Sequence, residues 1–285
     1  MSVGRLNFDG AAAPTVSIIM GAYNAGKTIR EAIESILGQE FTDWEFVICD
    51  DGSTYDTLAI CREYDAVYPG RFHVLANQNN RKLSATLNRC LSVARGKYIA
   101  RMDADDISKP TRLAKQVAVL ESRPEIDLVG TAMQRFGDRG AAGIVMPPER
   151  PNRFTLRRSI PFCHATIMAR NSMYKEVGGY NESSRTARSQ DVDLWFRFFD
   201  HGFVGINLNE PLYLVREDLA AISRRTFRTR WNGFLISING YRRLNYPLHW
   251  YVRPFVQLSK GFIPFRVQEW YREWQKRHVK DHAAD

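Results

Sequence analysis

Short apolar runs alternate with amphipathic stretches along the first half of the chain. Four of these runs are rich in β-branched or aromatic residues and predict strands buried on both faces, at residues 16–20, 44–49, 72–75 and 98–102. Apolar residues three and four apart predict helices between and after them, at residues 29–37, 83–94 and 110–120. This alternation indicates an α/β fold, with a doubly wound, mostly parallel sheet and helices on both faces.

The second half of the chain has a weaker pattern. We expect a strand at 127–133, a loop at 137–151, where Gly and Pro are frequent, and a strand at 162–169. Two helices follow, at 171–177 and 191–199. Beyond them lie aromatic-rich helical stretches, divided by Pro247, Pro254 and Pro264. The last part of the chain is therefore predicted to be a helical extension.

The positive charge of the chain is concentrated in this extension. The 285 residues contain 40 Lys and Arg against 31 Asp and Glu, a formal net charge of +9. Residues 221–285 hold 13 of the cations and 4 of the anions, so the rest of the chain is neutral. Four of the six tryptophans also lie there, at Trp231, Trp250, Trp270 and Trp274. We expect a basic, aromatic extension on a neutral body.

One segment of the extension suits a membrane surface. Within residues 263–280, Val267, Trp270, Tyr271 and Trp274 recur at helical spacing, with Lys and Arg over much of the remainder. Tryptophan beside cations is typical of a helix that lies on anionic lipid. The alternative is a helix packed on the body with a solvated basic face. No recognised nucleic-acid-binding module accompanies the charge, so we expect no nucleic-acid partner.

Several classes of protein are excluded. No apolar run approaches the roughly 20 residues that a transmembrane helix needs, and the first residues lack the apolar core of a secretory signal. The four cysteines, Cys49, Cys61, Cys90 and Cys163, show no paired spacing. They indicate reduced thiols in a cytosolic protein, and not a zinc site or a disulfide framework.

Three polar clusters follow three of the predicted strands, at Ala22-Tyr23-Asn24, Asp50-Asp51-Gly52-Ser53 and Asp103-Ala104-Asp105. The carboxyl ends of parallel strands share one edge of a sheet, where ligands bind in such folds. The chain has neither a P-loop nor a dinucleotide-binding motif. Asp-x-Asp at a strand end instead suits Mg²⁺ or Mn²⁺, with water and substrate phosphates as further ligands. A solvated acidic turn is the alternative.

These motifs resemble those of a known family. VSIIMGAYN, FVICDDGST and YIARMDADD are similar to the nucleotide-sugar-binding half of family 2 inverting glycosyltransferases, which have the GT-A fold. CHATIMAR, EVGGYNE and SQDVDLWFR are similar to the acceptor half of that family. The resemblance implies a leader at 1–13, a GT-A catalytic domain at 14–219 and a basic helical extension at 220–285. It divides the domain into a nucleotide-sugar half, 14–109, and an acceptor half, 110–219.

The resemblance implies a role for each polar cluster. Tyr23 stacks on the nucleotide base, and the Asp51 carboxylate accepts a hydrogen bond from the base edge, which suits uracil. Asp103 and Asp105 form the metal motif, with Asp105 as the direct ligand of Mn²⁺ or Mg²⁺. The full set at the nucleotide sugar is Ala22, Tyr23, Asn24, Asp51, Lys82, Asp103, Ala104 and Asp105. Gly21-Ala22 stands where the family more often has Pro before Thr or Ser, so a hydroxyl near the base is missing.

The acceptor half supplies the general base. The resemblance matches Asp191 to the carboxylate that takes the proton of the acceptor hydroxyl. Direct displacement at the anomeric carbon then inverts its configuration. The family usually has an acidic pair here, whereas this chain has Gln190-Asp191. Asp193 is a rival for the same role, because the sequence alone does not show which carboxylate faces the substrate.

Four further residues have two interpretations each. His164 is either a structural residue or a pocket residue that touches the diphosphate or the metal. Trp195 is either a core residue, as its apolar neighbours favour, or a platform for a sugar. Arg81 and Lys82 follow a strand, and they either reach the diphosphate or lie in a solvated loop.

Together these features predict a metal-dependent hexosyltransferase. We expect it to move a sugar from a nucleotide-diphosphate donor, preferably a UDP-sugar, to a hydroxyl of a polyprenyl-diphosphate-linked glycan. The resemblance is to bacterial exopolysaccharide enzymes, so we expect a cytoplasmic protein, peripheral at the inner face of the cell membrane. The alternatives are a non-catalytic nucleotide-sugar-binding module and a sugar nucleotidyltransferase. Retention of all the carboxylates named above speaks against the first, and the lack of a basic Gly-rich loop speaks against the second.

Overall fold

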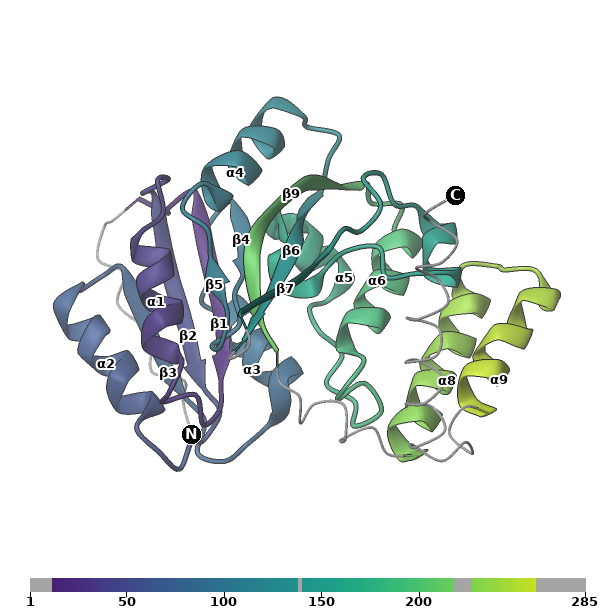
Figure 1. Ribbon diagram of the computed structural model, residues 1–285, viewed down its shortest axis with the longest axis horizontal. Coiled ribbons are helices and arrows are strands. Elements are labelled where there is room, and N and C mark those ends of the chain that lie inside the picture. Colours follow the sequence, from purple (N-terminus) through teal and green to yellow (C-terminus); the bar gives the residue numbers. More distant parts are fainter. Residues whose placement is uncertain (1–11, 138–139, 218–226, 260–285) are drawn as a thin grey trace.

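The computed structural model describes residues 12–137, 140–217 and 227–259. Within these residues a nine-stranded sheet has the order β3-β2-β1-β4-β8-β6-β9-β5, and β7 pairs with β6. Helices pack on both faces of the sheet (Figure 1). Most paired residues lie in parallel ladders, so the α/β fold with a mostly parallel sheet is confirmed.

The N-terminal half builds the parallel part of the sheet. Its strands are β1 (Val16–Ala22), β2 (Trp44–Asp50), β3 (Phe72–Ala76) and β4 (Tyr98–Arg101). The connecting helices are α1 (Ile29–Leu37), α2 (Thr57–Val67) and α3 (Lys82–Leu91). All four predicted strands are confirmed, as are the two predicted helices, whereas α2 was not predicted.

The second half contributes antiparallel strands. Its elements are β5 (Ile107–Ser108), α4 (Arg112–Ser122), β6 (Leu128–Gly137), β7 (Gly140–Val145), η1 (Arg153–Arg157), η2 (His164–Thr166), β8 (Met168–Arg170), α5 (Asn171–Val177), α6 (Gln190–Asp200) and β9 (Gly205–Arg216). β8 runs antiparallel to both β4 and β6, whereas β6 and β9 are parallel. The predicted helices at α4, α5 and α6 are confirmed.

Two of the expectations for this half are wrong. Residues 137–151, expected as a loop, contain β7, which pairs with β6 from Met133↔Val145 onward. Residues 162–169 are not one strand. The Thr166 N–H and hydroxyl both donate to the Cys163 carbonyl, each at 2.9 Å, which closes the η2 turn and leaves only the end of the segment for β8.

The core consists of two apolar layers, one on each face of the sheet. Val16, Ile18 and Met20 of β1 pack with α1, α2 and α4, whereas Ile19 packs with α3, α5 and α6. All four side chains are fully buried. A strand covered by helices on both faces has no polar face, which is why it reads as a continuous apolar run.

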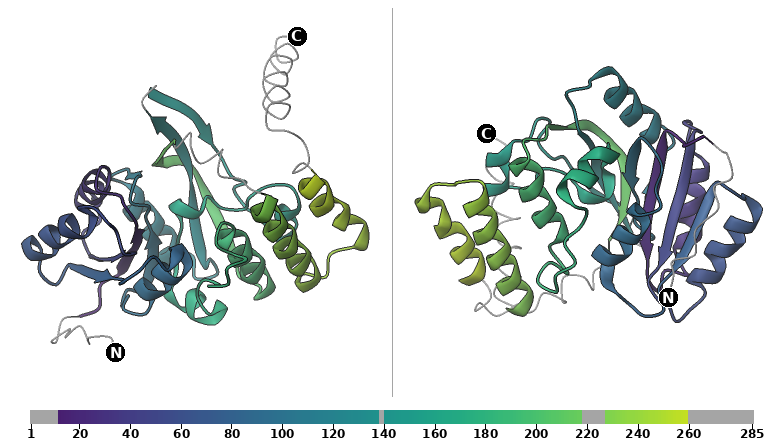
Figure 2. Two further views of the ribbon diagram at one scale, coloured as in Figure 1. Left: turned by 90° about the horizontal axis from the view of Figure 1, so that it is seen from below. Right: turned by 180° about the vertical axis from the view of Figure 1, so that it is seen from behind.

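The C-terminal helices pack against the body at the end opposite α1 and α2 (Figures 1 and 2). They are α8 (Phe227–Arg243), η3 (Leu248–Tyr251) and α9 (Val252–Ser259). Phe196 of α6 joins Ile236 and Tyr241 of α8 in a third apolar cluster. Gly240 permits this approach, because a Cβ there would lie 2.3 Å from the Phe196 ring.

The prolines of the extension behave differently from one another. Pro247 separates α8 from η3, as predicted. Pro254 does not divide two helices, because it is the third residue of α9, in the first turn, where proline is tolerated. Pro264 and the amphipathic segment 263–280 lie outside the described residues. The same holds for most of the leader.

Two further expectations concern the whole chain. Each helix in the described ranges is too short or too polar to cross a lipid bilayer. The four cysteines all lie in the described part and are buried free thiols, as predicted.

Candidate active site

A pocket of about 1000 Å³ opens at the carboxyl edge of the parallel strands. We call it the strand-end pocket. Its lining includes residues from the β1–α1 loop, from the β2–α2 loop, from the segment after β4 and from the end of β9: Tyr23, Asn24, Lys27, Thr28, Tyr55, Asp103, Ala104, Asp105 and Arg216. Two of the three predicted polar clusters therefore meet in one cavity, although about 80 residues separate them in sequence. This is the expected outcome for parallel strands.

The first cluster supplies an aromatic face and a loop anchor. Tyr23 is 48% exposed in the pocket, so its ring is available for stacking. Asn24 is instead engaged with the second cluster: its side-chain carbonyl accepts the Thr54 N–H at 2.9 Å, and its N–H donates to Ser53 Oγ. Asn24 adopts a positive φ of 52°, which asparagine tolerates better than most residues. The first and second strand-end loops are thereby tied together.

The second cluster holds the loop that follows β3. Asp51 is buried, and its Oδ1 accepts hydrogen bonds from Asn77 Nδ2 and the Arg81 N–H, each at 2.8 Å. Its Oδ2 accepts the Lys82 N–H at 2.9 Å, where the backbone has a φ of 73°. Asp51, Arg81 and Lys82 do not line the strand-end pocket. Oδ2 keeps one lone pair, so the predicted contact of Asp51 with a base edge stays a prediction.

The third cluster contains one engaged and one available carboxylate. The Arg101 guanidinium donates to both oxygens of Asp103, at 2.6 and 2.5 Å. Asp105 lines the pocket, and its carboxylate has no side-chain hydrogen-bond or ion-pair partner within the described residues. The backbone here is anchored from two sides. Thr28 Oγ1 donates to the Ala104 carbonyl at 2.9 Å, and Arg216 Nε donates to the Asp105 carbonyl at 3.0 Å.

The electrostatics of this cluster favour a bound cation. Burial, with the neighbouring Asp103, raises the pKa of Asp105. Burial and both neighbours raise the pKa of Asp106 to about 8. Burial and the neighbouring carboxylates thus oppose negative charge on Asp105 and Asp106, and a divalent cation would relieve that repulsion.

The donor set fits Mg²⁺ or Mn²⁺ in one particular way. Within the described residues no group of three or more His, Cys, Asp or Glu side chains is placed to hold a metal. The chain therefore offers Asp105, with Asp103 behind it, and leaves other positions to substrate oxygens. Magnesium sites at phosphates usually have this composition, with one or two carboxylates.

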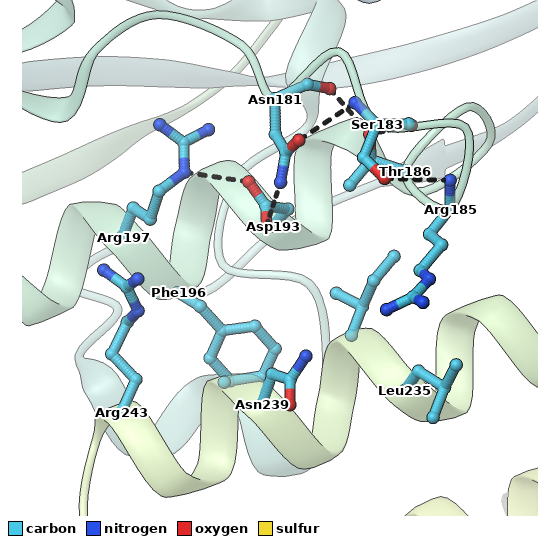
Figure 3. A pocket seen from close by; sticks show the side chains of 12 residues that line it. Asn181, Ser183, Arg185, Thr186, Asp193, Phe196, Arg197, Leu235, Asn239 and Arg243 are labelled. Atoms are coloured by element: carbon cyan, nitrogen blue, oxygen red, sulfur yellow. Dashed lines mark hydrogen bonds and ion pairs between the residues drawn. The ribbon is translucent and has the colours of Figure 1, made fainter.

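Asp191 and Asp193, the two candidates for the base, have different surroundings. Asp193 Oδ2 pairs with Arg197 Nε at 2.8 Å, and its Oδ1 accepts a hydrogen bond from Asn181 Nδ2 at 3.2 Å (Figure 3). Asp191 has no side-chain partner within the described residues. Burial raises the pKa of Asp191, against the opposing effect of the Arg101 charge. The Asp193 carboxylate is thus engaged, whereas that of Asp191 has no side-chain partner within the described residues; which of the two is the base stays a prediction.

His164 and Trp195 lie behind the site and not in the strand-end pocket. His164 Nε2 is 2.9 Å from Tyr180 Oη, and the ring sits edge-on to Trp195 at 5.9 Å. Burial and the Arg101 charge hold the pKa of His164 well below its usual value, so the imidazole is neutral. Trp195 is fully buried among apolar side chains. Its burial favours the core interpretation of Trp195, but Trp195 also lines a second pocket, between α6, α8 and α9, so its role stays a prediction.

Among the pocket residues that were missed from the sequence, three bring a cation or an aromatic ring. Lys27 brings a cation into the lining, and Tyr55, 73% exposed, brings a second aromatic ring. Arg216 reaches the pocket from the end of β9, where its side chain also pairs with Glu31. Only the pairing of β9 with β5 and β6 brings Arg216 there, and no local pattern in the sequence shows it.

The fold defines the class of protein. Residues 1–349 of S. aureus TarS, solved in complex with UDP-GlcNAc, superpose with a TM-score of 0.67 over 87% of this chain and 71% of theirs, at 19% identity. The mannosyltransferase PcManGT of Pyrobaculum calidifontis, in complex with GDP-Man and Mn²⁺, gives a TM-score of 0.58 over 88% of this chain and 70% of its own, at 18% identity. The chain has the GT-A glycosyltransferase fold.

Sequence relatives identify the family. The model of Glycosyl transferase family 2 matches residues 17–178. A putative glycosyltransferase, EpsE of Bacillus subtilis, is 44% identical over 268 residues, covering 94% of this chain and 96% of the relative. The amylovoran biosynthesis glycosyltransferase AmsE of Erwinia amylovora is 27% identical over 231 residues, covering 79% and 84%. This chain belongs to glycosyltransferase family 2.

Proposed function

We propose that the chain is an inverting glycosyltransferase that moves a sugar from a UDP-sugar to a hydroxyl of a lipid-linked glycan. The observation that carries the proposal is the strand-end pocket, where the exposed ring of Tyr23 and the available carboxylate of Asp105 line the same cavity. A nucleotide diphosphate needs both, one for its base and one for its charge. Family membership supports glycosyl transfer over nucleotidyl transfer.

In this proposal the donor lies with its base on Tyr23 and its diphosphate over the Asp-x-Asp segment. Asp105 would hold the divalent cation, with Asp103 behind it, and the cation would neutralise the departing diphosphate. Arg101 keeps Asp103 in place through two short hydrogen bonds. Lys27 and Arg216 add positive charge to the same lining. The Mn²⁺ and nucleotide sugars in the related solved structures support this choice of ligands.

Asp191 acts as the general base. Its carboxylate sits at the start of α6, with a pKa raised by burial, and therefore accepts a proton more readily than an exposed aspartate. The acceptor hydroxyl gives its proton to Asp191 and attacks the anomeric carbon as the nucleotide diphosphate leaves from the opposite face. A single displacement of this kind inverts the anomeric centre.

The proposal also includes the acceptor and the location of the protein in the cell. The relative AmsE is named for the synthesis of a polysaccharide, which supports a glycan acceptor. The extension at 220–285 carries all of the net positive charge, which supports a peripheral position on an anionic membrane at the cytoplasmic side. The catalytic domain is then 14–219, with its division near 109.

Incubation of the protein with a panel of UDP- and GDP-sugars tests the function. Release of nucleoside diphosphate is followed with Mn²⁺ or with EDTA, with and without a prenyl-diphosphate-linked sugar. The proposal expects metal-dependent turnover of a UDP-sugar that increases with the acceptor. Tight binding of a nucleotide sugar without turnover under every condition would instead indicate the non-catalytic module.

A further inference from the structure

A second large pocket lies between the start of α6 and the C-terminal helices α8 and α9. Its volume is about 880 Å³, and its walls come from η1, the start of α6, α8 and α9. η1 contacts α6, and α6, α8 and α9 lie side by side (Figures 1 and 2). It shares no lining residue with the strand-end pocket. Ser189 and Val192, which stand on either side of Asp191 along the chain, line it. A group bound there is held beside the proposed base.

The lining of this pocket is strongly cationic. Four arginines from four different segments contribute to it, Arg158, Arg188, Arg230 and Arg253. Among its described lining residues there is no Asp or Glu. We call it the arginine pocket. Guanidinium groups gathered without carboxylates are suited to phosphate, which they bind through paired, charge-assisted hydrogen bonds.

A neighbouring pocket on the other side of α6 gives a useful contrast. There Arg197 pairs with Asp193 at 2.8 Å (Figure 3). Arg243, which also lines that pocket, pairs with Asp200 at 3.0 Å. In the arginine pocket, Arg253 donates to the Arg158 backbone carbonyl at 2.7 Å, and neither of these two arginines has a carboxylate partner within the described residues. The charges of Arg158 and Arg253 are thus not offset by a carboxylate of the described residues.

Apolar side chains continue from the arginine pocket onto the surface. Phe234 and Leu258 line the pocket, and the Phe234 ring contacts Phe255 of α9 at 4.8 Å between centroids. Phe255 is 57% exposed, and Val252 and Val256 of the same helix are also exposed. An anionic head in the pocket would therefore lie next to a surface that suits a hydrocarbon chain.

We propose that the arginine pocket binds the diphosphate of a lipid-linked acceptor, with the first part of its isoprenoid chain along α9. This inference rests on the proposed function, and it adds where the acceptor binds and by which group it is recognised. The diphosphate is fixed by the arginines, the lipid leaves over Phe255, and the sugar hydroxyl is brought to Asp191. The donor diphosphate occupies the strand-end pocket and does not compete.

The test is binding of farnesyl diphosphate, a soluble prenyl diphosphate, to the full-length protein by calorimetry. The variant Arg158→Gln/Arg253→Gln is expected to lose about ten-fold or more in affinity, since it loses two charged donors. Gln257→Glu, which adds a carboxylate at an exposed position of the lining, is expected to weaken binding without disturbing the fold. Arg185→Gln, in the neighbouring pocket, changes the charge by the same single unit as Gln257→Glu and is the control, which is expected to bind as wild type does.

The control ligands separate the sources of phosphate. Inorganic diphosphate and UDP are both expected to bind this site more weakly than farnesyl diphosphate. At equal concentration, neither is expected to displace it. The inference is overturned if UDP displaces the probe, if inorganic diphosphate binds equally well, or if Arg185→Gln loses as much affinity as the double variant.

The same samples distinguish this inference from the proposed function. UDP binding and UDP-sugar hydrolysis report on the strand-end pocket, and both are expected to be unchanged in the double variant and in Gln257→Glu. If wild type hydrolyses a UDP-sugar but does not bind farnesyl diphosphate, the acceptor inference is wrong and the donor assignment stands. If farnesyl diphosphate binds but no nucleotide sugar is ever turned over, the proposed function is wrong.

Discussion

Replacement of Asp191 by asparagine removes the proposed base with almost no change in size. The carboxylate has a pKa raised by burial and no side-chain partner within the described residues, so its loss breaks no ion pair. Loss of a general base typically lowers turnover by about 10²–10⁴, which corresponds to roughly 3–5 kcal/mol of transition-state stabilisation. Affinity for UDP is expected to stay within a few-fold of wild type, because the strand-end pocket does not include Asp191.

Asp193→Asn is the matched control on the same helix. It removes a carboxylate that pairs with Arg197 at 2.8 Å, so it is expected to lower stability by about 1 kcal/mol and turnover only modestly. Steady-state assays give kcat, calorimetry gives UDP affinity, and urea titration gives stability. If Asp193→Asn loses turnover at constant UDP affinity and Asp191→Asn does not, the roles of the two residues are exchanged.

The raised pKa of Asp191 also predicts the pH dependence of the reaction. A base must be deprotonated to act, so turnover falls as the pH drops through its pKa. Since burial moves this pKa above that of an exposed aspartate, the acidic limb of the kcat profile is expected at a higher pH than the usual aspartate value. An acidic limb at or below that value, with Asp191 essential, would contradict the raised pKa.

Three further predictions concern stability and membrane binding. Burial raises the pKa of Glu45, but hydrogen bonds from His73, Ser17 and Arg95 outweigh burial and bring the pKa to about 2. The ionised carboxylate therefore contributes about 3 kcal/mol of stability above pH 4.5, and this contribution is lost as the pH falls toward 2. Urea titrations across this pH range should show the loss in wild type but not in Glu45→Gln. Gly240→Ala should destabilise the protein by about 1–3 kcal/mol, because its Cβ would meet the Phe196 ring. Gly233→Ala on the same helix has 3.9 Å to the nearest side chain and should not destabilise it. Equal urea midpoints for the two variants would contradict this prediction. Full-length protein should bind anionic vesicles, with each engaged Lys or Arg adding about 1 kcal/mol, and should be released as the salt concentration rises. If cosedimentation at low salt shows equal binding to anionic and neutral vesicles, the extension does not bind membranes electrostatically.

The sheet, and the edge of it where the strand-end pocket lies, could be predicted because both are encoded in short stretches of sequence. Strands such as β1 and β2 are buried on both faces, so their apolar runs stand out, and each ends in a polar cluster. α2 was missed because only Thr57, Ile60 and Cys61 of its residues are buried, which is too narrow a stripe to show a helical period. β7 was missed because its first residues are Gly and Ala, and pairing with β6 is what makes it a strand.

The candidate site was predictable to the extent that its residues follow strands. Tyr23, Asp103 and Asp105 were found in this way. Arg216 was not, because it reaches the Asp105 carbonyl across 111 positions of sequence. The choice between Asp191 and Asp193 likewise depends on side-chain partners, and only the structure supplies them. The arginine pocket is lined by residues from four segments that are distant in sequence, so no sequence motif predicts it.

The central claim is that Asp105 binds a divalent cation that holds the donor diphosphate in the strand-end pocket. Calorimetric titration of UDP into wild type and Asp105→Ala, each with Mn²⁺ and with EDTA, tests it most directly. We expect tight binding only for wild type with Mn²⁺, and equally weak binding in the other three samples. Tight UDP binding by Asp105→Ala with Mn²⁺, or by wild type in EDTA, would contradict the claim.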